Sequence, residues 1–315
     1  ARQTQWRNKA VSDLYEPGSV FKLITCAAAL DAGAVSKNST FYCGESISVA
    51  GTRFHCANHK RHGSQTVTQA LENSCNPVFT QLALRLGSER FYQYLHAFGL
   101  GRRTGIDLYG EAGGILIGQS RVKNVDLARI GFGQSVAVTP IQMITAACAV
   151  VNGGRLMQPY VVSDILGPEG EVIDHLSPVC KRQVLKEETS RTMREMMEAV
   201  VLYGGGRNAQ IAGYRVGGKS GTSQKLDSAD EKARIASFVA VAPINDPQFL
   251  CLVCLDEPHS WTTAGGSLSA PVCAEVLEQT LVYKGVPRAV EPETDTDPAQ
   301  TAADLPADGD SFDGA

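Results

Sequence analysis

Three strand-like segments near the C-terminal end most strongly limit the fold of this chain. They cover residues 214–225, 234–243 and 248–257, and only short loops join them. Connections this short join antiparallel neighbours, so we expect one antiparallel sheet. Helix-like segments come before and after it. The sequence therefore predicts an α+β domain, an antiparallel sheet flanked by helices.

The first half of the chain has helical patterns, most of them ended by glycine. A hairpin is expected over residues 41–56 and another around residues 168–170. We expect one domain over residues 1–290, with a helical part at about 19–152 and a sheet part at about 155–285. The expected helices are 19–32, 67–72, 77–86, 89–98, 125–130, 140–151, 187–203 and 270–281.

Charge is unevenly distributed along the 315 residues. The formal net charge is −4, but residues 291–315 contain eight acids and no base. Without these eight negative charges, the net charge of residues 1–290 is +4. This acidic segment has few large apolar residues and is predicted to be disordered. The body, in contrast, has a globular composition, with 43% apolar residues in the whole chain. No apolar run is long enough to span a bilayer, and no basic stripe with interleaved aromatics suggests nucleic acid binding.

Ser19 and Lys22 lie three residues apart at the start of an apolar helix, which places them on one face. N–H groups at a helix start favour an alkoxide on the serine, and burial would favour a neutral lysine amine that accepts its proton. The alternative is an ordinary serine cap. Ser120 and Lys123 repeat the same spacing, so the spacing alone does not decide between the two.

Ser74 and Asn76 form a second candidate, just before a proline that starts a helix. A hydroxyl and a carboxamide two residues apart could point into one cleft. They could equally be ordinary helix caps, and Ser36 and Asn38 show how common this pattern is.

The third candidate is the glycine-rich segment VGGKSGTSQK. Alternation along a strand places Lys219 and Gly221 on one side and Ser220 and Thr222 on the other. Glycines weaken a strand but allow a ligand or another backbone to come close. The alternative is a glycine-rich edge strand without a function.

Together, the SVFK, SCN and KSG segments follow the order of the SxxK, SDN and KTG motifs of penicillin-binding proteins and class A β-lactamases. The surrounding segments RNKAVSDLYEPGSVFK, GFGQSVAVTPIQ, GYRVGGKSGTSQK, SFVAVAP and LDEP sharpen this match. Over about residues 6–285 the chain resembles class B penicillin-binding transpeptidases, most closely the stage V sporulation protein D group.

The resemblance implies a five-stranded antiparallel sheet with the active site between the sheet and the helices. In the family, two strands and a membrane-anchored pedestal precede the SxxK helix, whereas only about eighteen residues do so here. We therefore expect missing N-terminal strands and an unpaired sheet edge. The implied location is the outer face of the cytoplasmic membrane, with the anchor in an N-terminal segment absent from this chain.

The resemblance also assigns the catalytic roles. Ser19 would attack the penultimate D-Ala carbonyl of a peptidoglycan stem peptide, and Lys22 would be its general base. Ser74 would relay a proton to the leaving D-Ala, and Asn76 would hold the substrate amide. Lys219 would supply positive charge.

Ser220, Gly221 and Thr222 would form the substrate-binding segment, in which the Ser220 and Thr222 hydroxyls would bind the terminal carboxylate. The backbone N–H groups of Ser19 and Thr222 would form the oxyanion hole. No cofactor is implied. The implied partners are stem peptides ending in D-Ala-D-Ala, β-lactam antibiotics and a cell-wall glycosyltransferase.

Three other functions are compatible with these motifs. A serine β-lactamase shares them but needs a base for rapid deacylation, and no ExxLN-type segment stands at a suitable position. A D,D-carboxypeptidase differs only in using water as the acceptor. A non-catalytic penicillin-binding module is the third alternative.

A metal site is a further possibility, because Cys43, Cys56, His59 and His62 include CxxH and HxxH spacings and His55 is adjacent. The implied mechanism needs no metal, and the segment CANHKRHG is polar enough for a solvated loop. We therefore expect no metal.

Cys56 and Cys75 are a possible redox pair. The resemblance places the protein where disulfides can form, and family members similar to this chain have cysteines at both positions. An oxidised pair would distort the cleft, because Cys75 lies between Ser74 and Asn76. The alternatives are an inert buried Cys75 or a structural disulfide between Cys43 and Cys56.

Overall fold

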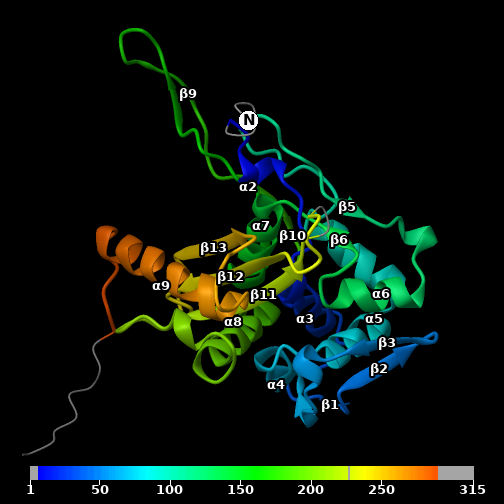
Figure 1. Ribbon diagram of the computed structural model, residues 1–315. Helices are drawn as coiled ribbons and strands as arrows, with labels where there is room; N and C mark the ends of the chain where they lie inside the picture. Colours follow the sequence, from blue (N-terminus) through cyan, green and yellow to red (C-terminus); the bar gives the residue numbers. More distant parts are fainter. Residues whose placement is uncertain (1–5, 226–227, 290–315) are drawn as a thin grey trace, which may run out of the picture.

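The computed structural model describes residues 6–225 and 228–289, and its centre is a three-stranded antiparallel sheet between helical layers (Figure 1). Strand β12 is in the middle, β11 lies on one side and β13 on the other. Their bounds are Gly217–Gln224 for β11, Arg234–Ala242 for β12 and Phe249–Asp256 for β13. These strands match the three predicted segments, and the predicted α+β class is confirmed.

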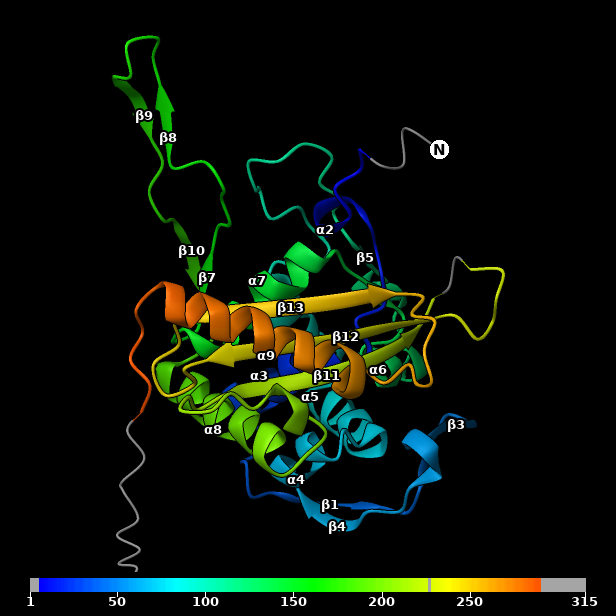
Figure 2. The same cartoon turned by 60° about the vertical axis from the view of Figure 1, so that its left-hand side comes forward.

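The central strand β12 explains the layers, because its side chains alternate between the two faces of the sheet. Phe238 and Ala240 belong to one cluster of buried residues with Cys273 of helix α9 (Gly265–Tyr283). Val239 and Val241 belong instead to the large core beneath the other face. Figure 2 shows α9 across the front of the sheet.

The helical layer surrounds α3 (Lys22–Asp31), in which every residue from Lys22 to Ala29 is buried. A 3₁₀ turn, η1 (Gly18–Phe21), leads directly into this helix. The other helices of the layer are α4 (Val67–Glu72), α5 (Asn76–Ala97), α6 (Asn124–Gly131), α7 (Pro140–Val151) and α8 (Glu187–Leu202), and a short helix, α2 (Lys9–Ser12), precedes them.

Two predicted helix boundaries need comment. The segments 77–86 and 89–98 form the two halves of α5, which is broken at Gly87, where the backbone is left-handed with φ 75°. The last helix begins at Gly265 rather than at residue 270. The predicted start was wrong because it placed Pro271 in the first turn, where its missing N–H costs little; the helix instead continues through this proline.

Two-stranded ribbons lie outside the central sheet and its helices. The predicted hairpin at residues 168–170 is confirmed as β8 (Asp164–Leu166) with β9 (Val172–His175), which project from the body in Figure 2. The hairpin predicted over 41–56 is only partly correct. Its second part forms β2 (Ser46–Val49) and β3 (Thr52–His55), but β1 (Thr40–Cys43) pairs with the distant β4 (Gly63–Thr66).

The remaining ribbons are short, and the outer edge of the sheet is open. Within the described residues, no strand pairs with the free side of β13. None of the described helices is long and apolar enough to span a bilayer.

The predicted disordered tail lies outside the described residues. The other pairs are β5 (Ile115–Leu116) with β6 (Val136–Ala137) and β7 (Arg155–Met157) with β10 (Cys180–Gln183).

Glycines bring the η1 turn against its neighbours. A Cβ at Gly133 would lie 2.0 Å from the carbonyl oxygen of Gly18, and the Gly18 N–H donates to the Gly133 carbonyl at 3.0 Å. A Cβ at Gly221 of β11 would lie 3.0 Å from the carbonyl oxygen of Pro17 and 2.9 Å from Val20 Cγ2. The turn that carries Ser19 is therefore held between two backbones that require glycine.

We predict that Gly133→Ala destabilises the protein more than Gly51→Ala. Both glycines are left-handed, with φ 86° and 82°, but nothing lies within 4 Å of a Cβ at Gly51. Gly51→Ala should lower the free energy of unfolding by about 1 kcal/mol through backbone strain alone. Gly133→Ala should cost about 1–3 kcal/mol more because of the clash. Urea unfolding of the two variants measures the difference, and equal losses would contradict the packing argument.

Candidate active site

The Ser19 and Lys22 side chains meet at the junction between the 3₁₀ turn and helix α3. Ser19 lies within η1 and Lys22 is the first residue of α3. Because the turn continues into the helix, positions i and i+3 share a face, and Ser19 Oγ lies 3.0 Å from Lys22 Nζ. The predicted proximity of the two groups is confirmed, although Ser19 precedes the α-helix.

The second motif occupies the sharp connection between α4 and α5. Ser74 has a left-handed backbone with φ 52°, an unusual conformation for a non-glycine residue, and Cys75 is the N-cap of α5. This turn directs Ser74 and Asn76, the residues on either side of Cys75, toward Lys22. Lys22 Nζ lies 2.6 Å from the Ser74 carbonyl oxygen, 3.2 Å from Ser74 Oγ and 2.7 Å from Asn76 Oδ1.

Lys219 completes the polar cluster from the edge strand β11. Burial along β11 alternates as predicted, with Lys219 and Gly221 buried, Ser220 half-buried and Thr222 exposed. Lys219 Nζ donates to Ser74 Oγ at 3.0 Å and to the Ser220 carbonyl at 2.9 Å. The Ser74 hydroxyl therefore lies between the amines of two lysines.

The hydrogen-bond inventory around Lys22 suits a neutral amine. A neutral amine has two N–H donors and one lone pair, whereas the Ser74 carbonyl and Asn76 Oδ1 can only accept. These two acceptors can take both N–H groups. The lone pair is then left for the hydroxyl of Ser19, which is the arrangement that general-base removal of its proton requires.

Burial lowers the pKa of both lysines. Lys22 is fully buried, and desolvation lowers its pKa to about 7, with nearby Cys75 and Cys56 opposing the shift. The pKa of Lys219 is also lowered, first by burial and then by the charge of Lys22. Two adjacent ammonium groups repel one another, so this site favours having one of the two amines neutral.

Of the remaining residues in the third motif, Thr222 contacts the start of α9. Thr222 Oγ1 accepts from the Gly265 N–H at 3.2 Å and can donate to the Thr263 carbonyl at 3.5 Å. A Cβ added at Gly221 would point at the η1 turn, so glycine at this position allows β11 and the turn to pack closely. The Ser220 side chain remains half-buried beside Lys219.

The two discarded serine motifs lie elsewhere. Ser120 is in an exposed 3₁₀ turn, and Ser36 contacts Ser39 on the surface. Sequence reasoning missed one participant, the His55 carbonyl, which accepts from Asn76 Nδ2 at 3.0 Å. No local signal could have found it, because the contact depends on how the ribbons fold back on α5.

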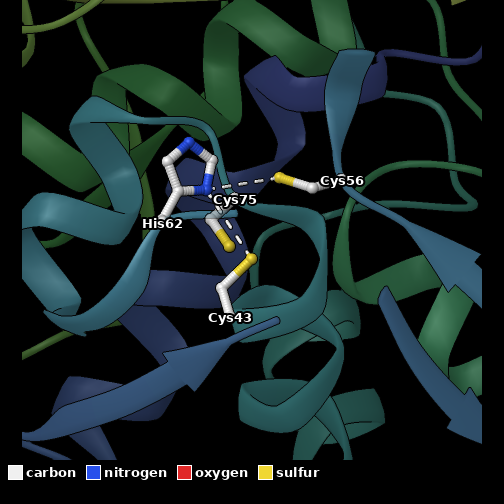
Figure 3. Close-up of side chains that lie close together, drawn as sticks. All are labelled: Cys43, Cys56, His62 and Cys75. Carbon is white, nitrogen blue, oxygen red and sulfur yellow. Dashed lines mark hydrogen bonds between the residues drawn. The ribbon is translucent and has the colours of Figure 1, made fainter. Parts of the chain in front are cut away.

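Cysteines from distant segments gather behind the second motif (Figure 3). The sulfurs of Cys43, Cys56 and Cys75 and a ring nitrogen of His62 all lie within 4.8 Å of one another. All three thiols are free, so the proposed Cys56–Cys75 disulfide stays a prediction. His59 is not part of this group, because its Nδ1 faces Glu45 Oε1 at 2.9 Å.

The chain is similar to known proteins along most of its length. The penicillin binding protein transpeptidase domain family matches residues 1–278. Stage V sporulation protein D of Bacillus subtilis is 43% identical over 89% of this chain, and the peptidoglycan D,D-transpeptidase FtsI of Escherichia coli is 31% identical over 86%. The chain spans 44% of the length of each of these relatives.

Solved structures show the same fold. The transpeptidase domain of Burkholderia pseudomallei penicillin-binding protein 3 has a TM-score of 0.81 at 29% identity, covering 90% of this chain and 84% of that chain. Penicillin-binding protein 3 of Mycobacterium tuberculosis in complex with ampicillin has a TM-score of 0.82 at 28% identity, covering 93% and 68%.

We predict that the rate constant for the reaction of Ser19 with a fluorescent penicillin rises with pH up to about 7. Only the neutral Lys22 amine can accept the serine proton, and its pKa is about 7. Below that value the rate constant should rise about tenfold per pH unit, and above it the rate should level off. Labelling reactions quenched at fixed times, at saturating and at subsaturating probe concentrations, give the rate constant at each pH. A rate independent of pH across this range would contradict Lys22 as the base.

Proposed function

The chain belongs to the penicillin-binding protein transpeptidase domain family, and on that premise we propose that it is a peptidoglycan D,D-transpeptidase acting through an acyl-enzyme on Ser19. The observation that carries the proposal is the hydrogen bonding of Lys22, which joins Ser19 to the second motif. We place the transpeptidase domain at residues 1–290.

In the first step, the Ser19 hydroxyl attacks the carbonyl carbon of the penultimate D-Ala of a donor stem peptide. The neutral Lys22 amine takes the serine proton, and the new Ser19 ester bond forms as the D-Ala-D-Ala peptide bond breaks. The leaving amine of the terminal D-Ala needs a proton. Ser74 Oγ lies 3.2 Å from Lys22 Nζ and can relay that proton to it.

In the second step, an amine of a neighbouring stem peptide attacks the ester. Its proton passes back through the same groups, the cross-linking amide forms, and Ser19 is released as the free hydroxyl. Lys22 alternates between the neutral and charged forms, which a pKa of about 7 makes accessible at neutral pH.

Substrate recognition is assigned to strand β11. As the edge strand of the sheet beside Ser19, it offers backbone groups to an extended peptide. In this proposal the Ser220 and Thr222 hydroxyls and the charge of Lys219 bind the terminal carboxylate. The N–H groups of Ser19 and Thr222 would stabilise the oxyanion, each worth about 2.7–4 kcal/mol in the transition state.

The proposal extends to location and partners. We propose that the domain acts at the outer face of the cytoplasmic membrane, where peptidoglycan is assembled, with an anchor supplied by an N-terminal segment. Peptidoglycan strands come from a glycosyltransferase, which is the proposed partner. β-Lactams would act as covalent inhibitors of this chain, and penicillin-binding protein 3 of Mycobacterium tuberculosis, a structural relative, forms a complex with ampicillin.

We predict that benzylpenicillin forms a stable one-to-one adduct on Ser19. Intact-mass measurement should show one added penicilloyl group, and peptide mapping should place it on the Ser19 peptide. Ser19→Ala should abolish the adduct, while Ser120→Ala should leave it unchanged. Rapid loss of the adduct by hydrolysis would favour a β-lactamase, and labelling at Ser120 would contradict the assignment.

We also predict that Lys219→Ala slows acylation by about 100-fold or more, since it removes a preorganised positive charge from the carboxylate site. Lys232→Ala is the matched control, because this lysine is exposed and lies outside the cluster. Lys225 is less suitable, since it pairs with Asp256 at 2.9 Å. Second-order acylation rate constants for both variants provide the test. Equal effects of the two substitutions would show that β11 does not bind the carboxylate.

A further inference from the structure

We propose that Cys43, Cys56, His62 and Cys75 form a structural zinc site behind the second catalytic motif. The sequence-based expectation was that the chain holds no metal. That expectation considered His59 as a ligand and did not include Cys75. The folded chain instead brings together three thiols and one imidazole from four separate places along the sequence (Figure 3).

The distances within the cluster fit a zinc ion. In tetrahedral coordination with Zn–S of about 2.3 Å and Zn–N of about 2.0–2.1 Å, a sulfur and a nitrogen lie about 3.6 Å apart. His62 Nδ1 lies 3.6 Å from Cys43 Sγ and 3.5 Å from Cys56 Sγ. All four donor atoms lie within 4.8 Å of one another, so small side-chain movements would bring all of them to one ion.

Apolar packing of thiols does not account for this arrangement. The three cysteines are buried, as small hydrophobic residues often are. However, a single ring nitrogen of His62 points at two sulfurs, and its one lone pair can accept only one thiol proton. A metal satisfies that nitrogen and all three sulfurs together.

The ribbons around these four residues would also be stabilised by a cross-link. Strands β1 to β4 form two separate two-stranded ribbons, which are marginally stable alone. Of the described residues in 40–66, the buried apolar side chains are Val49, Phe54, Cys43 and Cys56. So small a core benefits from a metal. The ion would join the ribbons to Cys75 at the start of α5.

The site would position catalytic groups without touching substrate. Three cysteines and one histidine fill a tetrahedral zinc and leave no open position, which is typical of structural sites. Cys75 lies between Ser74 and Asn76, and Cys56 follows His55, whose carbonyl holds Asn76 Nδ2 at 3.0 Å. Zinc would therefore fix the second motif from both sides.

The experiment measures metal in the full chain purified with a phosphine reductant. We expect one zinc per chain by elemental mass spectrometry. Replacement by Co²⁺ should give the visible absorption bands of tetrahedral thiolate coordination. Absence of metal, iron in place of zinc, or a cobalt spectrum without thiolate bands would overturn the proposal.

Variants identify the ligands. Cys43→Ser and His62→Ala should weaken zinc binding by more than the roughly 10- to 100-fold that loss of an outer-shell partner costs. His62→Cys should keep the metal, with a cobalt spectrum shifted toward four thiolates. The matched controls are His59→Ala on the same loop and Cys148→Ser in α7, and both should keep one zinc. Full zinc binding in Cys43→Ser and His62→Ala would contradict the site, and the wild-type measurement remains decisive if a variant does not fold.

A second readout concerns the role of the ion. Removing zinc should lower the melting temperature and slow penicillin acylation of Ser19, and adding zinc back should restore both. The acylation effect rests on the proposed function, whereas metal content and cobalt spectra do not, so the two can fail separately. An unchanged melting temperature after zinc removal would contradict a structural role.

Discussion

The buried amine of Lys22 is the interaction on which the other parts of the site depend. It lies at the start of α3, in which every residue from Lys22 to Ala29 is buried, and its nearest partners come from η1, from the turn before α5 and, through Ser74, from the sheet. A buried cation is costly unless it is paired or neutral. Here the surroundings supply acceptor oxygens in place of a counter-ion. The same burial that holds the helical and sheet parts together therefore also produces the base.

How much could be predicted depended on whether a feature is local in sequence. Ser19 and Lys22, and the alternation along β11, follow from short-range periodicity, and both agree with the structure. The pairing of β1 with β4 and the approach of Cys75 to Cys43 depend on contacts across many residues, for which a single sequence carries no signal. The start of α9 was misplaced because Pro271 outweighed the tertiary packing that carries the helix through it.

The proposed zinc site and the catalytic cluster share one short turn. Ser74 has a left-handed backbone, and such a conformation persists only where its surroundings hold it in place. The hydrogen bonds to Lys22 and Lys219 act on one side of this turn, and the four donor atoms act on the other. A Cys56–Cys75 disulfide would use two of those donors, so oxidation and metal binding would compete for the same sulfurs.

The contact of the η1 turn with Gly133 and Gly221 has a consequence for inhibitor shape. The turn that carries Ser19 is packed backbone on backbone at Gly18, so it has little room to shift when a ligand binds. Residues 257–264 lead into α9, and the Thr263 carbonyl contacts Thr222 at 3.5 Å. Under the proposed function, selectivity among β-lactams should therefore follow the substituents that face residues 257–264, while the ring that meets Ser19 encounters a rigid surface.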